Sequence, residues 1–341
     1  MRPLRLAADA RVVTGDVRGI GRYARAILRL LLERDDVELT LLLPGPMPFV
    51  HRTALARALG SRRFRVRSRA RGVDLVWHPA NGTFFDSTAP NVATIHDAIA
   101  FTQPNPDLAK REREQAPILR SARTAVRVIA DSAFARDDLN GVLGIPLERI
   151  VPIHLGVDAG FCPGTPAPLP AGLEPGRYVL FVGPIGEPRK NFDVLYAAFK
   201  GAWPADGPAL AIVGPQAPND PKIVAIPSVD DPGLCALYRG AIALAIPSYH
   251  EAFGLPLLEA MACGTPAIAA RASALPEVGG DAPYYVAAGD GAGWKQALLA
   301  VAGSAPLRER MRAAGLHRAQ DFDWQHVADR HLALFREVAA A

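Results

Sequence analysis

Cysteine is scarce in this chain, and neither a long apolar run nor a tandem repeat occurs in it. The three cysteines, Cys162, Cys235 and Cys263, lie far apart in the sequence without metal-binding spacing, so we expect reduced thiols of a cytoplasmic protein. No apolar run reaches membrane-spanning length, which excludes an integral membrane protein with helical spans. The first residues lack the apolar core and cleavage site of a signal peptide. With half of its residues hydrophobic, the chain is predicted to be globular.

Positive charge is concentrated in the first half of the chain. Residues 1–165 contain 24 Lys and Arg against 17 Asp and Glu, whereas the remainder contains 14 against 17. Such an excess predicts an anionic partner: acidic lipid, a phosphorylated acceptor or nucleic acid. The densest segment, 51–71, predicts a short helix with Arg52 and Arg57, followed by a strand that places five arginines on one face. These are Arg63, Arg65, Arg67, Arg69 and Arg71.

Phe64 is the single aromatic residue among these arginines, and such a low aromatic content argues against nucleic acid and favours an anionic membrane surface. A solvated, arginine-rich edge of the protein is the alternative interpretation. A cytoplasmic protein is predicted, with a peripheral position on the inner face of the membrane as a further expectation.

Short apolar segments alternate with helical patterns along the whole chain, which predicts parallel α/β layers. Strands are expected at 4–9, 37–43, 74–78, 91–96, 124–130, 149–155, 178–183, 209–214, 223–227, 241–247, 265–270 and 283–287. Helices are expected at 22–33, 106–122, 132–144, 306–320 and 323–340, the third beginning at a Ser132 cap.

A segment rich in Pro and Gly, 156–176, interrupts this alternation and is typical of an interdomain linker. It predicts an N-terminal Rossmann-like domain over 1–165 and a second over 173–322, facing each other across a cleft. The last segment, 323–341, is predicted to be a separate helix.

The most informative segment is 247–266, PSYHEAFGLPLLEAMACGTP, which follows a predicted strand. Pro256 suits the first turn of a helix, here expected from Leu257 to Cys263, with Gly264 as its cap. Free backbone N–H groups and the positive end of such a helix form a site for phosphate. Glu251 at its mouth and Glu259 about two turns along could bind one extended ligand. The alternative interpretation is that the two acids lie at a helix start and on an exposed helical face without binding a ligand.

The glycine-rich segment 14–24 supports a second hypothesis. Gly19 and Gly21, followed by Ala24, fit the G-x-G-x-x-A pattern of dinucleotide-dependent oxidoreductases. Those enzymes require an acid after the second strand, where this sequence has Pro44, so the oxidoreductase hypothesis is disfavoured.

Five ordered segments resemble retaining glycosyltransferases of family 4, which have the GT-B fold. In chain order they are RGIGRYARAIL (18–28), ATIHD (93–97), VGPIGEPRKN (182–191), LYRGAIALAIPS (237–248) and the segment that begins at Pro247. The resemblance implies an α/β protein of GT-B architecture with two Rossmann-like domains. It also implies that the final helix crosses back onto the N-terminal domain.

The resemblance also implies roles for individual residues. Glu251 matches the acid that contacts donor-sugar hydroxyls, Glu259 the acid that holds the ribose, and Lys190 the lysine that neutralises the diphosphate. Pro184 stands where the family often has arginine, so Arg189 is the candidate for the missing cation. Gly183 and the segment Ala252, Phe253, Gly254 and Leu255 line the donor, and Ser228 and Val229 match the base-binding loop.

On the N-terminal side, His96 ends a predicted strand where ligands gather in open α/β sheets, and it matches the family histidine that touches the donor sugar. A structural histidine is the alternative. Gly19 and Gly21 are implied to contact donor phosphate or acceptor. Arg18, Arg22 and, less directly, Asp97 are candidates on the acceptor side, although Asp97 could simply cap the next segment.

The implied function is retaining transfer of a hexose from a nucleotide diphosphate sugar, with GDP-mannose as the first expectation. The acceptor would be a glycan or lipid-linked hydroxyl in bacterial surface polysaccharide or lipopolysaccharide synthesis. No cofactor or metal is expected, because Lys190 and Arg189 would neutralise the diphosphate, and the only D-x-D, at 321–323, is interpreted as a helix start. A nucleotide-sugar epimerase of GT-B fold and a non-catalytic nucleotide-binding protein remain as alternatives.

Overall fold

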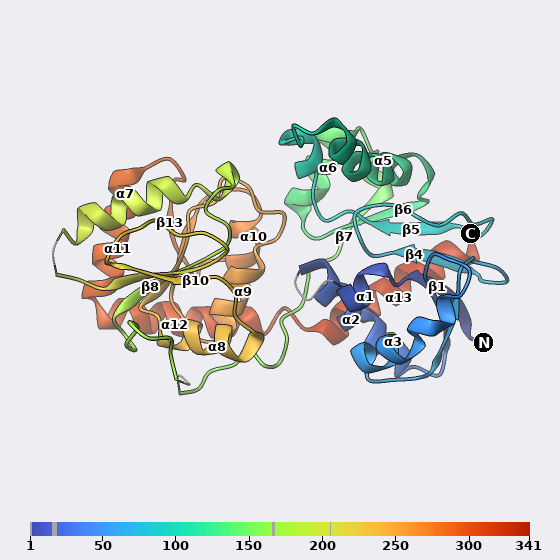
Figure 1. The fold of residues 1–341 in the computed structure, drawn as a ribbon, viewed down its shortest axis with the longest axis horizontal. Coiled ribbons are helices and arrows are strands. Elements are labelled where there is room, and N and C mark those ends of the chain that lie inside the picture. The colour runs from blue at the N-terminus through green and yellow to red at the C-terminus, as the bar shows by residue number, and fades with distance from the viewer. Residues whose placement is uncertain (1, 16–18, 166–167, 205) are drawn as a thin grey trace. The chain divides into compact units, whose positions relative to one another are not determined.

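The computed structural model describes residues 2–15, 19–165, 168–204 and 206–341, which form two units. The first comprises Met1–Gly156 and Asp323–Ala341, and the second comprises Val157–Phe322. Figure 1 shows each unit as a sheet with flanking helices. Both sheets consist of parallel strands, which confirms the prediction of two Rossmann-like domains.

The first unit is built on a seven-stranded sheet with the order β3-β2-β1-β4-β5-β6-β7. Its strands are β1 (Leu4–Asp9), β2 (Val37–Leu42), β3 (Phe64–Arg67), β4 (Leu75–His78), β5 (Asn91–Thr94), β6 (Arg127–Ala130) and β7 (Ile150–Pro152). Its α-helices are α1 (Arg11–Gly15), α2 (Gly19–Leu32), α3 (Arg52–Leu59), α4 (Ile99–Thr102), α5 (Leu108–Thr124), α6 (Ala133–Leu143) and α13 (Trp324–Ala340). The described part of this unit also contains the 3-10 turns η1 (Pro48–His51) and η2 (Leu147–Arg149).

The second unit is built on a six-stranded sheet with the order β10-β9-β8-β11-β12-β13. Its strands are β8 (Tyr178–Val182), β9 (Ala209–Val213), β10 (Ile223–Ile226), β11 (Ala243–Ile246), β12 (Ala267–Ala270) and β13 (Tyr284–Val286). Its helices are η3 (Pro188–Lys190), α7 (Phe192–Ala202), α8 (Asp231–Gly240), α9 (Leu255–Ala262), α10 (Leu275–Gly279), α11 (Gly291–Gly303) and α12 (Ala305–Ala319).

Hydrophobic patterning explains both layers. Central strands such as β4, β11 and β12 are buried at every position, as expected where helices cover both faces of a parallel sheet. In α2 the residues Ala24, Ile27, Leu28 and Leu31 are buried on one helical face. The last helix, α13, packs against α2 (Figure 1), and His331 on α13 bonds to the Tyr23 hydroxyl at 2.6 Å.

The structure corrects the predicted strand in the arginine-rich segment and adds a spatial contact between two of the cysteines. The predicted strand through Arg63–Arg71 is wrong in its length, because β3 ends at Arg67 and only Arg65 and Arg67 of the five arginines lie on it. Arg52 and Arg57 do lie on a short helix, α3. The cysteines are free, but Cys235 and Cys263 are not far apart in space: α8 and α9 are neighbours, and the two sulfur atoms are 3.4 Å apart.

None of the helices in the described residues is both long and apolar enough to cross a membrane.

Candidate functional site

Candidate residues follow the carboxyl ends of parallel strands in each unit, where ligands collect in open α/β sheets. In the second unit, Gly183 follows β8, Ser228 and Val229 follow β10, and Glu251 follows β11. In the first unit, His96 and Asp97 follow β5. The two groups are described separately.

The connection from β11 to α9 turns sharply at Gly254. Its φ of 102° lies in the left-handed region, and an added Cβ would meet the Leu275 side chain at 2.8 Å, so glycine is required on both grounds. The helix begins at Leu255, not at Leu257 as predicted, because Pro256 is tolerated anywhere in the first turn. Glu259 therefore lies about one turn into the helix. In this first turn Pro256 has no N–H and the Leu257 amide donates to the Gly254 carbonyl oxygen at 2.9 Å, so the positive end of the helix dipole is what the helix start offers to an anion.

Glu251 is buried in a cluster of two cations and a hydroxyl, here called the Glu251 cluster. Lys190 Nζ lies 2.7 Å from Glu251 Oε1, and Arg189 Nη1 lies 3.5 Å from Oε2. The Ser248 hydroxyl donates to Oε1 at 2.7 Å, and the Glu251 amide donates to Ser273 Oγ at 3.0 Å. The structure thus brings Glu251, Lys190 and Arg189 together, although Glu251 is 61 residues from Lys190 in the sequence.

The Glu251 carboxylate is held in its charged form. Burial alone would raise the pKa of Glu251, but Lys190 and Arg189 outweigh burial and lower this pKa below its ordinary value. The cluster therefore presents two fixed cations held by one carboxylate, and an incoming anion can share these cations.

The lowered pKa of Glu251 predicts a specific acid sensitivity. A depressed folded-state pKa contributes stability that is complete above the ordinary value of 4.5 and is lost as the pH falls through the folded-state value. In urea unfolding between pH 6 and pH 3, we expect the wild-type free energy of unfolding to fall more steeply below pH 4.5 than that of Glu251→Gln. Parallel curves for the two proteins would show that Glu251 makes no such contribution.

The two cations of the cluster are fixed by the turn η3. Lys190 ends this turn and is buried beside Gly183, where the φ of 146° favours glycine, although an added Cβ would lie at an ordinary contact distance of 3.5 Å from Lys190 Cε. Arg189 Nη2 bonds to Glu187 at 2.5 Å, while Arg189 Nε is buried without a partner among the described residues. The Nε–H group of Arg189, beside Lys190, is therefore available to donate to a ligand.

Glu259 is buried between α8 and α9. Its Oε2 accepts a hydrogen bond from the Tyr238 hydroxyl at 2.9 Å. The other implied donor contacts surround this side of the sheet: Ala252 and Leu255 are partly exposed, Phe253 and Gly254 are buried, and Ser228 is exposed next to the half-buried Val229. These six residues lie on loops or first helical turns that follow β10 and β11.

His96 is buried in the first unit with both ring nitrogens bonded to acceptors. Nδ1 lies 2.8 Å from Asp131 Oδ2, and Nε2 lies 2.9 Å from the Pro79 carbonyl oxygen. A carbonyl oxygen cannot donate, so Nε2 carries a proton, and with Asp131 ionised Nδ1 carries a second one and the ring is an imidazolium. Burial lowers the pKa of His96, but Asp131 and the Pro79 carbonyl outweigh it and raise this pKa above its ordinary value. The Tyr23 ring packs edge-on at 5.0 Å.

Asp131 was missed by sequence reasoning, although a signal existed. It directly follows β6, the parallel neighbour of β5, so its side chain and His96 emerge at the same sheet edge. The residue that directly follows each predicted strand is a candidate site residue, whether or not it belongs to a family motif.

The remaining N-terminal candidates have simpler surroundings. Asp97 Oδ1 accepts from the Ile99 amide at 3.0 Å and so starts α4, as the alternative interpretation proposed. Gly19 and Gly21 lie in the first turn of α2, and Arg22 follows them, partly buried. Arg18 lies outside the described residues. Asp323 caps α13 by accepting from the Gln325 amide, so the D-x-D is a helix start.

A pocket of about 1190 Å³ in the first unit was also missed. Residues from the loops after β2, β3 and β4 line most of it, including Pro44, Phe84 and Phe85. Arg69, Arg71 and Arg120 contribute positive charge to the same pocket.

Family comparisons cover most of the chain. The family described as "Glycosyltransferase Family 4" matches residues 17–161, and the one described as "Glycosyl transferases group 1" matches residues 176–304. Together they span both units.

Curated relatives agree with these matches. The O-antigen chain mannosyltransferase B of Escherichia coli is 27% identical over 74% of this chain and 72% of its own length. The phosphatidyl-myo-inositol mannosyltransferase of Mycobacterium leprae is 35% identical over 49% of this chain and 48% of its own length. The chain thus spans between about half and three quarters of the length of these two relatives.

Among solved structures, Anabaena HepE, crystallised with UDP and glucose, superposes with a TM-score of 0.70 at 16% identity. The superposition covers 98% of this chain and 100% of HepE, which shows the shared GT-B fold.

Proposed function

Because the chain belongs to glycosyltransferase family 4, we propose that it transfers a hexose, with retention of configuration, from a nucleotide diphosphate sugar to a hydroxyl group. The observation that carries this proposal is the Glu251 cluster, in which Lys190 and Arg189 converge on one buried carboxylate at the start of α9. Cleavage of a glycosyl–phosphate bond leaves negative charge on the diphosphate, and fixed cations beside a helix N-terminus stabilise that charge.

The remaining steps assign one role to each group. Lys190 and Arg189 receive the diphosphate, while Glu251 orients both cations and hydrogen-bonds the sugar hydroxyls. We assign His96 to the donor sugar, as its family motif implies. No protein nucleophile is assigned: the departing phosphate oxygen takes the proton of the acceptor hydroxyl, which attacks from the same face. We propose no metal or cofactor, since the two cations supply the required charge.

The proposed donor is GDP-mannose, and the proposed acceptor is a glycan or lipid-linked glycan of bacterial surface polysaccharide or lipopolysaccharide synthesis. Two curated relatives named as mannosyltransferases support mannose, although HepE was crystallised with UDP and glucose. The pocket lined by Phe84, Phe85 and three arginines supports an acceptor that combines sugar rings with anionic groups.

Calorimetry with UDP-, GDP-, ADP- and dTDP-sugars tests this choice. Preferential binding of GDP-mannose is the expected result, and tighter binding of another base would replace the donor assignment.

Removal of Glu259 should act mainly on nucleotide affinity. Its buried carboxylate can exchange the Tyr238 bond for the ribose hydroxyls, so Glu259→Ala is expected to weaken nucleotide diphosphate binding about tenfold or more. Calorimetry measures this effect, with Glu309→Ala on the exposed face of α12 as the matched control. Unchanged affinity in Glu259→Ala would remove the ribose assignment.

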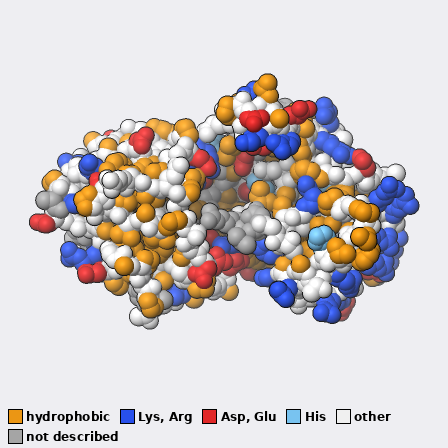
Figure 2. All heavy atoms as spheres, viewed as in Figure 1, with side chains coloured by type: hydrophobic (Ala, Val, Ile, Leu, Met, Phe, Trp, Pro, Cys, Tyr) orange, Lys and Arg blue, Asp and Glu red, His pale blue; other side chains and the backbone are white. Residues whose placement is uncertain are grey.

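We also propose that the protein is cytoplasmic and binds the inner membrane face through the 51–71 segment and the residues just before it. Met47, just before η1, and Phe49 and Val50 within η1 are 57%, 60% and 61% exposed. Their neighbour Pro48 lines a hollow together with Arg67, Ser68, Arg69 and Arg71. Lys and Arg side chains gather over the first unit in Figure 2. Exposed apolar side chains next to arginines are typical of a surface that binds anionic lipid.

Vesicle flotation tests the membrane contact. We expect the wild type to float with anionic vesicles at low salt and the double variant Phe49→Ser/Val50→Ser to lose at least tenfold in affinity, because two apolar side chains no longer enter the lipid. Val142→Ser, which alters an exposed valine on α6, should float like the wild type. Absence of salt-sensitive flotation in the wild type would leave the segment as ordinary surface.

A further inference from the structure

One face of the first sheet lacks the helix that usually covers it. Residues 68–74 connect the edge strand β3 to β4 across β2 and β1 without a helix, whereas parallel crossovers usually contain one. Ala70, Val73 and Phe85 cover only part of this face, where Ala7, Leu42 and Val76 lie.

The rest of this face is open and polar. Strand register places Arg5 beside Glu38, and Thr40 beside Arg65, with their side chains on the same face as Ala7. The opposite face, with Leu6, Leu39 and Phe64, is buried. A pocket of about 550 Å³, here called the open-face pocket, occupies the uncovered part.

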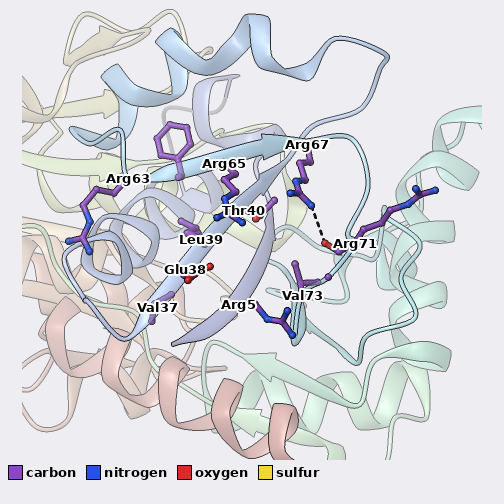
Figure 3. Close-up of a pocket in the computed structure, with 12 residues that line it drawn as sticks. Arg5, Val37, Glu38, Leu39, Thr40, Arg63, Arg65, Arg67, Arg71 and Val73 are labelled. Atoms are coloured by element: carbon purple, nitrogen blue, oxygen red, sulfur yellow. Dashed lines mark hydrogen bonds between the residues drawn. The ribbon is translucent and has the colours of Figure 1, made fainter. Parts of the chain in front are cut away.

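Arginine dominates the lining of the open-face pocket. Its charged residues are Arg5, Arg63, Arg65, Arg67, Arg71 and Glu38 (Figure 3). Arg5 is neutralised by Asp74 at 2.6 Å, and Arg63 by Asp35 at 2.8 Å.

The other three arginines keep their charge available. Within the described residues, Arg65, Arg67 and Arg71 form no ion pair with a carboxylate; Arg67 Nη1 donates only to the Arg71 carbonyl, at 3.2 Å. Arg65 and Arg67 also lie at alternate positions of one exposed edge strand, where like charges repel each other. An anion in the pocket would relieve that repulsion.

We propose that the open-face pocket binds a ligand that carries at least two phosphate groups. Guanidinium groups present planar pairs of donors that match phosphate oxygens, and several phosphates can engage several of them at once. The Thr40 hydroxyl adds a further donor on the pocket floor. The volume lies in the range of small-molecule sites. This site lies in the first unit and uses none of the residues assigned to the donor diphosphate.

Inorganic tripolyphosphate is the probe for this site. Calorimetry with Arg65→Ala/Arg67→Ala should show at least tenfold weaker binding than wild type. The matched control Arg57→Ala/Arg62→Ala removes two exposed arginines of the same segment that do not line the pocket, and it should bind like wild type. All three are compared in a Lys190→Met/Glu251→Gln background, which removes the main cation of the donor site without leaving a buried carboxylate unpaired. Equal losses in both double variants, or retained binding in the pocket variant, would overturn the proposal.

Two additional arms identify the chemistry and its source. Citrate, a polyanion without phosphate, should bind at least tenfold more weakly than tripolyphosphate, and equal affinity would overturn the assignment to phosphate. Vesicles with phosphatidic acid distinguish a lipid headgroup from a soluble ligand. Capture that depends on Arg65 and Arg67 and is displaced by tripolyphosphate supports the headgroup, whereas tripolyphosphate binding without capture supports a soluble phosphate. If neither probe binds, the proposal is wrong whatever the fate of the glycosyltransferase assignment.

Discussion

Replacing Lys190 with methionine is expected to lower kcat by about two to three orders of magnitude, the usual effect of removing one group that stabilises developing negative charge. Lys190 Nζ is the nearest cation to Glu251 in the cluster, at 2.7 Å. Because Lys190 is buried at the end of η3, water cannot take the place of its ammonium group. Steady-state release of nucleotide diphosphate measures the effect. Lys200→Met, an exposed lysine on α7, is the control and should turn over like wild type.

The same substitution should destabilise the second unit, since it leaves Glu251 buried without its main partner. Breaking a buried pair from one side costs roughly 3–5 kcal/mol, whereas neutralising both partners costs far less. Lys190→Met/Glu251→Gln should therefore recover most of the stability in urea unfolding but none of the activity. Recovery of activity together with stability would mean that the cluster only supports the fold.

Asp131→Asn is expected to lower kcat about 100-fold at pH 8 while the affinity for nucleotide stays unchanged. Asp131 holds the proton on His96 Nδ1 from 2.8 Å, and without this carboxylate, burial lowers the pKa of His96 below its ordinary value. His96 then loses its charge at a lower pH, so activity should recover partly as the pH is decreased. Asp131 thus acts as a positioning residue for His96.

Titration of His96 by NMR separates this effect from a structural one. In the wild type the imidazolium should persist above pH 6.5, and in Asp131→Asn it should deprotonate below this value. Asp137→Asn, at an exposed position on α6, is the control and should leave the titration unchanged. An unaltered His96 titration in Asp131→Asn would contradict the assignment.

The local sequence pattern was sufficient to predict the alternating strands and helices of both domains, but not where each strand ends. The apolar runs at β11 and β12 and the caps at Ser132 and Asp323 are signals within a few residues, and each is observed. The strand that was expected to continue through Arg71 ends at Arg67, because the chain must leave the sheet edge and reverse through Gly72, at φ 65°. Alternation alone does not encode where such a turn occurs.

Long-range proximity in the site was predicted only where a family motif supplied it. The resemblance assigned Glu251 and Lys190 separate roles around one donor, and the structure brings the two side chains into contact. Asp131 belongs to no motif and reaches His96 only through the register of β5 and β6. The sulfur atoms of Cys235 and Cys263 likewise meet only because α8 packs on α9. The open-face pocket exists because no helix connects β3 to β4, and the absence of that helix cannot be predicted from any single residue.

The most direct measurement of the central claim is NMR of the sugar product formed from GDP-mannose and a glycan acceptor, with EDTA present. We predict release of GDP only when acceptor is present, and a product with the anomeric configuration of the donor. Release or epimerisation of the donor sugar without acceptor, a product of inverted configuration, or loss of turnover in EDTA would contradict this account.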